Sequence, residues 1–147
     1  ARDAAAAESD ERSALFQAER AQNYHILLVD DNMLNREIAV ELLSDAGFAI
    51  TTAIDGKDAL EQVASSEPGT FDLVLMDIQM PIMNGYEAAR AIRALPNKEV
   101  ASVPILAVTA DAFDEDRQRA LEAGMNGHLP KPIEVDKLFG VLDTLLD

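Results

Sequence analysis

Five polar residues stand in the sequence where apolar segments typical of buried strands come to an end. Asp30 and Asp31 follow HILLV, Asp77 follows FDLVLM, Thr109 follows PILAV, and Lys131 follows HLP. In an open parallel sheet the carboxyl ends of the strands share one edge, so these side chains are expected to converge in one crevice. Three carboxylates would repel there, because two unit charges about 4 Å apart at an effective dielectric constant of about 20 interact by roughly 4 kcal/mol. We therefore expect the cluster to bind a cation.

The candidate ligands for that cation are oxygen atoms, because the chain has no Cys and only two His. A hard divalent ion fits, and Mg²⁺ is favoured because it needs only one or two carboxylates, a carbonyl and waters. Asp77 is the candidate nucleophile, since it ends the most hydrophobic segment, where a carboxylate is held in place and partly desolvated. A metal ion, the Lys131 ammonium and the Thr109 hydroxyl around one carboxylate can stabilise a transferring phosphoryl group.

Each of these residues also has a structural interpretation when it is taken alone. An Asp at a strand end commonly caps the next helix or forms a turn, Thr109 suits a strand end, and Lys131 suits a solvated surface. The coincidence of all five residues at the same predicted edge of one sheet favours the chemical interpretation.

The segments that position these residues alternate between strand and helix. Strands are expected over 25–30, 48–54, 71–77, 103–110 and 126–130, and helices over 34–47, 57–64, 84–95, 111–124 and 134–146. Leu34, Ile38 and Leu42 supply the helical spacing in the first helix. Such alternation implies parallel pairing with right-handed crossovers, and hence a three-layer α/β sandwich with helices on both faces of the sheet.

Composition limits the classes of partner. The 147 residues include 27 acidic and 12 basic side chains, for a net charge of −15, and 48% are hydrophobic. That length and hydrophobic content suit one domain with one core. The negative charge argues against direct contact with nucleic acid or anionic membrane surfaces. No apolar run approaches the roughly 18–20 residues that span a bilayer, and the lack of Cys excludes disulfide and thiolate chemistry.

The amino-terminal segment differs from the rest of the chain. Residues 1–23 mix acidic, basic and Ala residues, and only Leu15 and Phe16 are sizeable apolar side chains. Without an apolar stripe, a helix of this composition does not dock firmly on a core. We therefore expect residues 1–23 to be a helical or flexible linker and residues 24–147 to form the domain.

Four ordered segments resemble the receiver domains of two-component signalling, and most closely those attached to hybrid sensor histidine kinases. The segments are VDDN (29–32), LMDIQMPIMNGYE (75–87), PILAVTA (104–110) and AGMNGHLPKPI (123–133). The resemblance covers about residues 23 to 147. It implies a flavodoxin-like fold, with five helices around a five-stranded parallel sheet of order 2-1-3-4-5. It also implies a cytoplasmic domain, either free-standing or the carboxyl-terminal receiver of a hybrid kinase that is itself membrane-bound.

The resemblance assigns roles to the site residues. Asp77 matches the acceptor that takes a phosphoryl group from a histidine kinase or a histidine phosphotransfer domain, and then loses it slowly. Thr109 matches the hydroxyl that engages the phosphoryl oxygens, and Lys131 matches the lysine that pairs with them. The Lys131–Pro132 bond matches one that is usually cis, a form that X–Pro bonds adopt at little cost.

The resemblance likewise assigns the ligands of Mg²⁺. Asp31 and Asp77 match the carboxylates that bind the ion directly. Asp30 matches a residue that acts through water, and Gln79 matches the residue that supplies its main-chain carbonyl. These assignments agree with the preference of Mg²⁺ for oxygen ligands and retained waters.

His128 matches a switch position, three residues before the lysine, that is commonly aromatic in this family. Because His titrates near neutral pH, we expect His128 to move inward behind Thr109 on phosphorylation with a bias that depends on pH. The alternative is a half-exposed strand histidine without a switching role.

The family commonly signals through the face formed by its fourth helix, fifth strand and fifth helix, here 111–123, 126–130 and 134–146. The first of these helices is rich in acidic residues, and its thin apolar stripe makes it easy to shift. The side chains expected to pack on the sheet are Phe113, Ala120 and Leu121. A merely solvated acidic helix is the alternative.

Two other functions compete with the receiver. A phosphohydrolase of the haloacid-dehalogenase type also uses an aspartyl nucleophile at a strand end with Mg²⁺, but it resembles D-x-D, whereas Ile78 and Gln79 follow Asp77 here. A pseudo-receiver would bind partners without accepting phosphate, and the complete set of five polar residues argues against it. The oligomeric state is left open.

Overall fold

The computed structural model describes residues 24–80, 83–109, 114–131 and 133–145. The predicted linker over 1–23, Phe113 and the Lys131–Pro132 bond lie outside these ranges.

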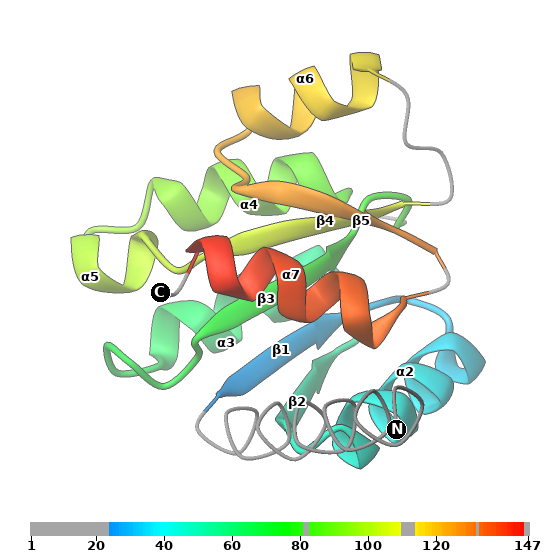
Figure 1. Cartoon of the computed structure of the whole chain (residues 1–147). Helices are drawn as coiled ribbons and strands as arrows, with labels where there is room; N and C mark the ends of the chain where they lie inside the picture. The colour runs from blue at the N-terminus through cyan, green and yellow to red at the C-terminus, as the bar shows by residue number, and fades with distance from the viewer. Residues whose placement is uncertain (1–23, 81–82, 110–113, 132, 146–147) are drawn as a thin grey trace, which may run out of the picture.

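A parallel sheet forms the centre of the molecule (Figure 1). Its strands are β1 (His25–Val29), β2 (Ala49–Ala53), β3 (Leu73–Asp77), β4 (Ile105–Thr109) and β5 (Gly127–Pro130). They pair in the order β2-β1-β3-β4-β5, with Val29 opposite Met76 and Asp77 opposite Val108. The order and the parallel pairing confirm the predicted fold, and the register brings the carboxyl ends of the strands to one edge.

Helices cover both faces of this sheet. They are α2 (Met33–Asp45), α3 (Gly56–Ser65), α4 (Gly85–Arg93), α5 (Lys98–Ala101), α6 (Asp114–Glu122) and α7 (Val135–Leu145). Figure 1 shows α2 and α7 on one side, and α3, α4 and α5 on the other. The short α5 was not predicted; it is one turn whose N-cap, Asn97, accepts a hydrogen bond from the amide of Glu99 at 3.1 Å. No helix in the described part of the chain is long and apolar enough to cross a membrane.

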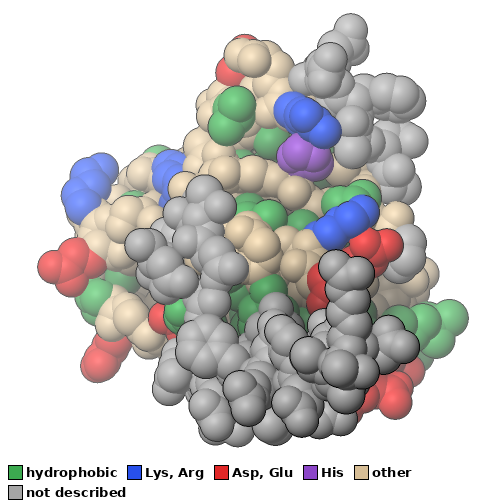
Figure 2. Space-filling view, viewed as in Figure 1, with side chains coloured by type: hydrophobic (Ala, Val, Ile, Leu, Met, Phe, Trp, Pro, Cys, Tyr) green, Lys and Arg blue, Asp and Glu red, His purple; other side chains and the backbone are tan. Residues whose placement is uncertain are grey.

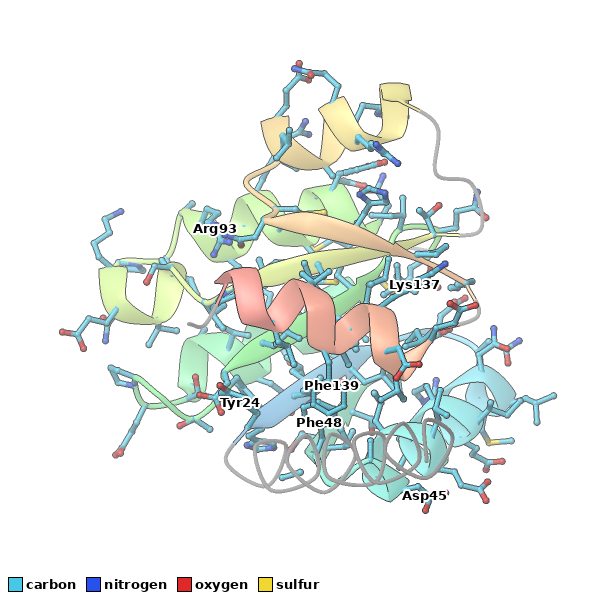
Figure 3. The ribbon with its side chains drawn as sticks, viewed as in Figure 1. Tyr24, Asp45, Phe48, Arg93, Lys137 and Phe139 are labelled. Atoms are coloured by element: carbon cyan, nitrogen blue, oxygen red, sulfur yellow. The ribbon has the colours of Figure 1, made fainter. Side chains whose placement is uncertain are left out.

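The alternation of side chains along each strand divides the core into two layers. In β1, Leu27 belongs to the layer under α3 and α4, whereas Ile26 and Leu28 belong to the layer under α2 and α7. In the second layer the rings of Phe48 and Phe139 stack with centroids 5.3 Å apart (Figure 3). Every residue of β3 is buried, as expected for a central parallel strand covered on both faces. Asp77 therefore stands at the end of a strand that is buried along its whole length.

The apolar stripe that predicts α2 does not face the core. Leu34 is 62% exposed, Ile38 58% and Leu42 38%, whereas Leu43 is fully buried. Helical spacing identifies the helix correctly but does not show which face is covered. Leu43, one residue beyond the stripe, makes the core contact, and the stripe is left as an apolar surface.

Helix α6 is attached to the sheet by small residues. Ala120 and Ala123 are buried, as part of the layer under α3 and α4, but Leu121 is 59% exposed. The prediction that Leu121 packs on the sheet is therefore wrong. One residue further along a helix the side chain points about 100° away, so burial of Ala120 turns Leu121 toward solvent. Among the described side chains, Ala120 and Ala123 make the core contact of this segment, and the ease with which α6 shifts stays a prediction.

Candidate functional site

The three predicted carboxylates meet at the carboxyl edge of the sheet. One carboxylate oxygen from each of Asp30, Asp31 and Asp77 lies within 4.8 Å of the others. Asp30 and Asp77 are buried and Asp31 is exposed. Neighbouring strands β1 and β3 position them, since Asp30 directly follows β1 and Asp77 ends β3. Figure 2 shows acidic side chains beside a basic one at the right of the molecule, the side toward which the strand ends point in Figure 1.

Lys131 is the cation that faces this cluster in the described structure. Its Nζ lies 3.0 Å from Oδ1 of Asp77 and 3.8 Å from Oδ2 of Asp30. The amide of Gln79 also donates to Oδ1 of Asp77, at 3.3 Å. One ammonium thus faces two buried carboxylates, and the charge of the cluster is only partly compensated.

The amino end of α4 closes tightly on Asp77. The amide of Gly85 donates to the carbonyl of Ile78 at 3.0 Å. A Cβ at position 85 would collide with the main-chain carbonyl of Asp77, so glycine permits this approach of helix to strand. Asn84 and Glu87 form a capping box there, in which Asn84 Oδ1 accepts from the Glu87 amide at 2.9 Å. These contacts hold Ile78, directly after Asp77, against the first turn of α4.

Burial raises the pKa of Asp77 above its usual value, and this is the largest influence on it. The hydrogen bond and charge of Lys131 lower the pKa, the charge of Asp30 raises it, and the amide of Gln79 lowers it. The net direction is upward, so without a further cation the ionised form is less favourable in the fold than in the unfolded chain. The fold therefore keeps Asp77 in a buried position where its ionised form is less favourable.

Thr109 and Lys131 approach the cluster from the last two strands. Thr109 is the final residue of β4, opposite Pro130 of β5, and its carbonyl accepts from the amide of Lys131 at 2.9 Å. The side chain of Thr109 is half-buried, and that of Gln79 is exposed. All the residues predicted from the strand ends, namely Asp30, Asp31, Asp77, Thr109 and Lys131, thus gather at one edge.

A family model for the response regulator receiver domain matches residues 26–143. The chain belongs to this family. The match begins within β1, ends within α7 and includes residues of all five strands.

The curated relatives of this receiver domain include much longer proteins. Hybrid signal transduction histidine kinase I of Dictyostelium discoideum is 41% identical over 121 residues, which are 81% of this chain and 7% of the kinase. The sensor histidine kinase RcsC of Salmonella typhi is 40% identical over 113 residues, 77% of this chain and 11% of that protein. The chain therefore corresponds to a small part of each kinase.

Solved structures of other receiver domains resemble this one. The receiver domain of a sensor histidine kinase from Pseudomonas aeruginosa, with magnesium coordinated in its active-site cleft, has a TM-score of 0.71 and 37% identity; the match covers 82% of this chain and 95% of that one. The receiver domain of a histidine kinase from Arabidopsis thaliana, complexed with Mg²⁺ and BeF₃⁻, has a TM-score of 0.70 and 33% identity, with 78% of this chain and 85% of that one covered.

The donor set of this receiver domain fits Mg²⁺. Three carboxylates and Lys131 together leave two negative charges for a divalent ion. Oxygen ligands on opposite sides of Mg²⁺ lie about 4.2 Å apart, given metal–oxygen distances of 2.0–2.1 Å. The three carboxylate oxygens lie within 4.8 Å of one another. They are thus close enough to surround one Mg²⁺ ion when one of them acts through water. Asp30, Asp31 and Asp77 are suited to hold the ion, and the carbonyl of Gln79 stays a predicted ligand.

Two residues that the sequence analysis did not single out hold Asp30 in place. The amide of Asn32 donates to Oδ1 of Asp30 at 2.9 Å, and Nη1 of Arg36 donates to the Asp30 carbonyl at 2.8 Å. Asn32 is also the N-cap of α2, since its Oδ1 accepts from the Asn35 amide at 3.0 Å. The available signal was Asn32 itself, a strong N-cap residue directly after the acidic pair.

His128 lies on β5 opposite Ala107 of β4 and is half-buried. Burial lowers the pKa of His128, and the positive charge of Arg117 on α6 lowers it further. Its neutral form is therefore favoured at neutral pH, and its titration falls on the acid side of the usual range for His. The inward movement of His128 stays a prediction.

Proposed function

We propose that this receiver domain accepts a phosphoryl group on Asp77 from a phosphohistidine, with Mg²⁺ bound at the carboxylate cluster. The observation that carries the proposal is the position of Asp77: it is buried at a strand end, within 4.8 Å of two further carboxylates and 3.0 Å from the Lys131 ammonium. A carboxylate in such a setting can act as a nucleophile while neighbouring cations stabilise the charge of the transferring group.

In the proposed reaction a carboxylate oxygen of Asp77 attacks the phosphorus atom of the donor. The new P–O bond forms as the P–N bond to the donor imidazole breaks, and the imidazole leaves with the bonding electron pair. Lys131, already at Asp77, turns to the phosphoryl oxygens, and Thr109 donates its hydroxyl to one of them. Mg²⁺, when bound, neutralises charge on the same oxygens. Slow hydrolysis returns the domain to its unphosphorylated form. Water attacks phosphorus, the P–O bond to Asp77 breaks, and the free carboxylate and inorganic phosphate are the products.

A groove leads from the acceptor to the exposed stripe of α2 and gives the donor a route. It has a volume of about 240 Å³, and both Asp77 and Lys131 line it together with Ile38 and Leu42. A donor helix that packs on the apolar part of this groove places its histidine next to Asp77. We therefore propose a histidine kinase or a histidine phosphotransfer domain as the partner.

The relatives support a place for this domain within a phosphorelay. Several are hybrid or sensor histidine kinases that the chain matches only in part. We propose that this receiver is likewise the receiver portion of a hybrid kinase, acts in the cytoplasm, and signals through α6, β5 and α7. The thin attachment of α6 by Ala120 and Ala123 supports a shift of that face.

We expect the switch of this domain to depend on pH through His128. Protonated His128 is repelled by Arg117 and is costly to bury, so the inward movement weakens as pH falls. Amide chemical-shift changes of β5 on addition of beryllofluoride and Mg²⁺ are expected to be smaller at about pH 5.5 than at about pH 8. In His128→Phe the chemical-shift changes of β5 are expected to be the same at both pH values. An equal dependence on pH in both proteins would eliminate the switching role of His128.

Intact-mass spectrometry after incubation with acetyl phosphate and Mg²⁺ tests the proposed function. One added phosphate, absent when Mg²⁺ is chelated, is the expected result. Turnover of phosphate esters without a stable adduct would instead indicate a phosphohydrolase, and no adduct under any condition would indicate a pseudo-receiver.

A further inference from the structure

A second cleft adjoins the acceptor site on the side of α4 and α6. It has a volume of about 250 Å³, and its lining includes Gln79, Asn84, Tyr86, Thr109 and Arg119. Gln79 and Thr109 border both the acceptor site and this cleft. The Gln79 amide contacts the carboxylate of Asp77, and Thr109 ends the strand next to that of Asp77. The cleft therefore begins beside the acceptor, at Gln79 and Thr109.

Arg119 is the cation of this cleft, and an aromatic ring holds it. Its guanidinium carbon lies 4.7 Å from the centroid of the Tyr86 ring, so α6 contacts α4 through a cation–π interaction. Arg119 is exposed, and no ion pair joins it to a carboxylate among the described side chains, which leave out those of residues 110–116. Cation–π contacts at exposed sites are weak, so a stronger anionic partner can draw the guanidinium away from the ring.

We propose that Arg119 leaves the Tyr86 ring and pairs with the phosphoryl group on Asp77, as a second cation beside Lys131. This inference rests on the proposed function. A phosphoryl group carries roughly 1.5 to 2 negative charges at neutral pH, whereas the free carboxylate carries one. Lys131, which lies 3.0 Å from Asp77 and 3.8 Å from Asp30, and a bound Mg²⁺ together balance the three carboxylates, so the charge that phosphorylation adds is left without a cation. The planar guanidinium is suited to bind two phosphoryl oxygens at once.

The same movement gives α6 a direction of shift. Among the described side chains, Ala120 of α6 and Ala123 directly after it pack in the core, and Arg119 packs on Tyr86. When Arg119 exchanges the ring for the phosphoryl group, its helix turn is drawn toward the carboxyl edge of the sheet. Arg119 thus links the charge on Asp77 to the position of α6. Its contact with the phosphoryl group forms only in the phosphorylated domain.

Arg117 provides a matched control on the same helix. Both arginines are exposed, and replacement of either by Gln removes one positive charge. Two residues apart on a helix, they point about 200° away from each other, and Arg117 acts on His128 rather than on Tyr86. Comparison of Arg119→Gln with Arg117→Gln therefore distinguishes a contact specific to Arg119 from a general loss of positive charge.

Titration with beryllofluoride in the presence of Mg²⁺ tests the pairing, since this ion stands in for the phosphoryl group. At about pH 8, where His128 is neutral and insensitive to Arg117, Arg119→Gln is expected to weaken apparent binding about threefold to tenfold. Arg119→Lys is expected to weaken it less, and Arg117→Gln to leave it unchanged. Binding of Mg²⁺ alone is expected to be the same in all four proteins. Equal weakening by Arg117→Gln and Arg119→Gln, or no weakening by either, would overturn the inference.

Tyrosine fluorescence gives a second measure of the exchange. The chain has no Trp and two Tyr, Tyr24 and Tyr86, so in Tyr24→Phe the emission comes from Tyr86 alone. Addition of beryllofluoride and Mg²⁺ is expected to change this emission, and Arg119→Gln in the same background is expected to remove most of that change. An emission change of the same size in both proteins would contradict the exchange.

The outcomes separate this inference from the proposed function. If the wild-type domain gains one phosphate on Asp77 while Arg119→Gln binds beryllofluoride as tightly as wild type, only the role of Arg119 fails. If the wild-type domain accepts neither phosphate nor beryllofluoride, the proposed function fails and the role of Arg119 falls with it.

Discussion

Replacement of Asp77 by Asn is expected to abolish phosphorylation by acetyl phosphate and by a phosphohistidine donor. The amide lacks the nucleophilic oxygen, and no other described carboxylate combines burial at the end of β3 with an ammonium 3.0 Å away. Intact mass before and after incubation with Mg²⁺ and acetyl phosphate measures the effect. Asp31→Asn, which leaves the acceptor in place, serves as a comparison in which Mg²⁺ binding weakens but an adduct still forms slowly.

Thermal unfolding shows that a loss of phosphorylation in Asp77→Asn is not a loss of folding. Burial raises the pKa of Asp77 in the fold, so the stability contributed by the protonated form is present at low pH and is lost as pH rises through that pKa. At neutral pH without Mg²⁺ the variant is therefore expected to melt at a higher temperature than wild type, and the gap is expected to narrow toward acid pH. A variant that is less stable than wild type at neutral pH would contradict this account of the charge at Asp77.

Replacement of Lys131 by Gln is expected to affect phosphorylation and Mg²⁺ binding in opposite directions. The ammonium lies 3.0 Å from Asp77 and 3.8 Å from Asp30. In the proposed reaction it stabilises the transferring phosphoryl group, but it repels a divalent cation. Loss of such a donor lowers the rate about 10²–10³-fold in other enzymes. We expect the rate of phosphorylation to fall by at least about tenfold, whereas the affinity for Mg²⁺ rises. Stopped-flow phosphorylation and Mg²⁺ titration measure the two effects.

Lys137→Gln is the matched control for Lys131→Gln. Lys137 (Figure 3) is exposed and pairs with Glu134 at 3.2 Å on the surface of α7, so its replacement removes the same charge away from the site. We expect both the rate and the Mg²⁺ affinity of this variant to match wild type at physiological salt. Parallel losses of rate and Mg²⁺ affinity in Lys131→Gln would show that Lys131 supports the ion rather than the transfer.

The sheet was predictable because its signal is local. Buried parallel strands are continuous apolar segments, and β3 is buried along its whole length. The faces of the helices were less predictable. Leu34, Ile38 and Leu42 have the spacing of a buried stripe yet point to solvent, and Leu121 is exposed beside the buried Ala120. Which face of a helix is covered depends on tertiary packing, which spacing within the helix does not contain.

The centre of the candidate site was predictable for a related reason. Asp30, Asp77 and Lys131 stand at strand ends, and parallel pairing alone brings strand ends together. The surroundings were not predictable in this way. Arg119 reaches Tyr86 from another helix, at 4.7 Å, and the two positions are linked only by the packing of α6 beside α4.

The central claim is that Asp77 is the residue that carries the phosphoryl group. Borohydride reduces an aspartyl phosphate to homoserine, so treatment of the phosphorylated domain followed by peptide mass spectrometry locates the acceptor. We expect homoserine at position 77 after incubation with Mg²⁺ and acetyl phosphate, and unmodified Asp at position 77 when Mg²⁺ is chelated. Homoserine at Asp30 or Asp31, or a phosphorylated domain with Asp77 unmodified after reduction, would contradict it.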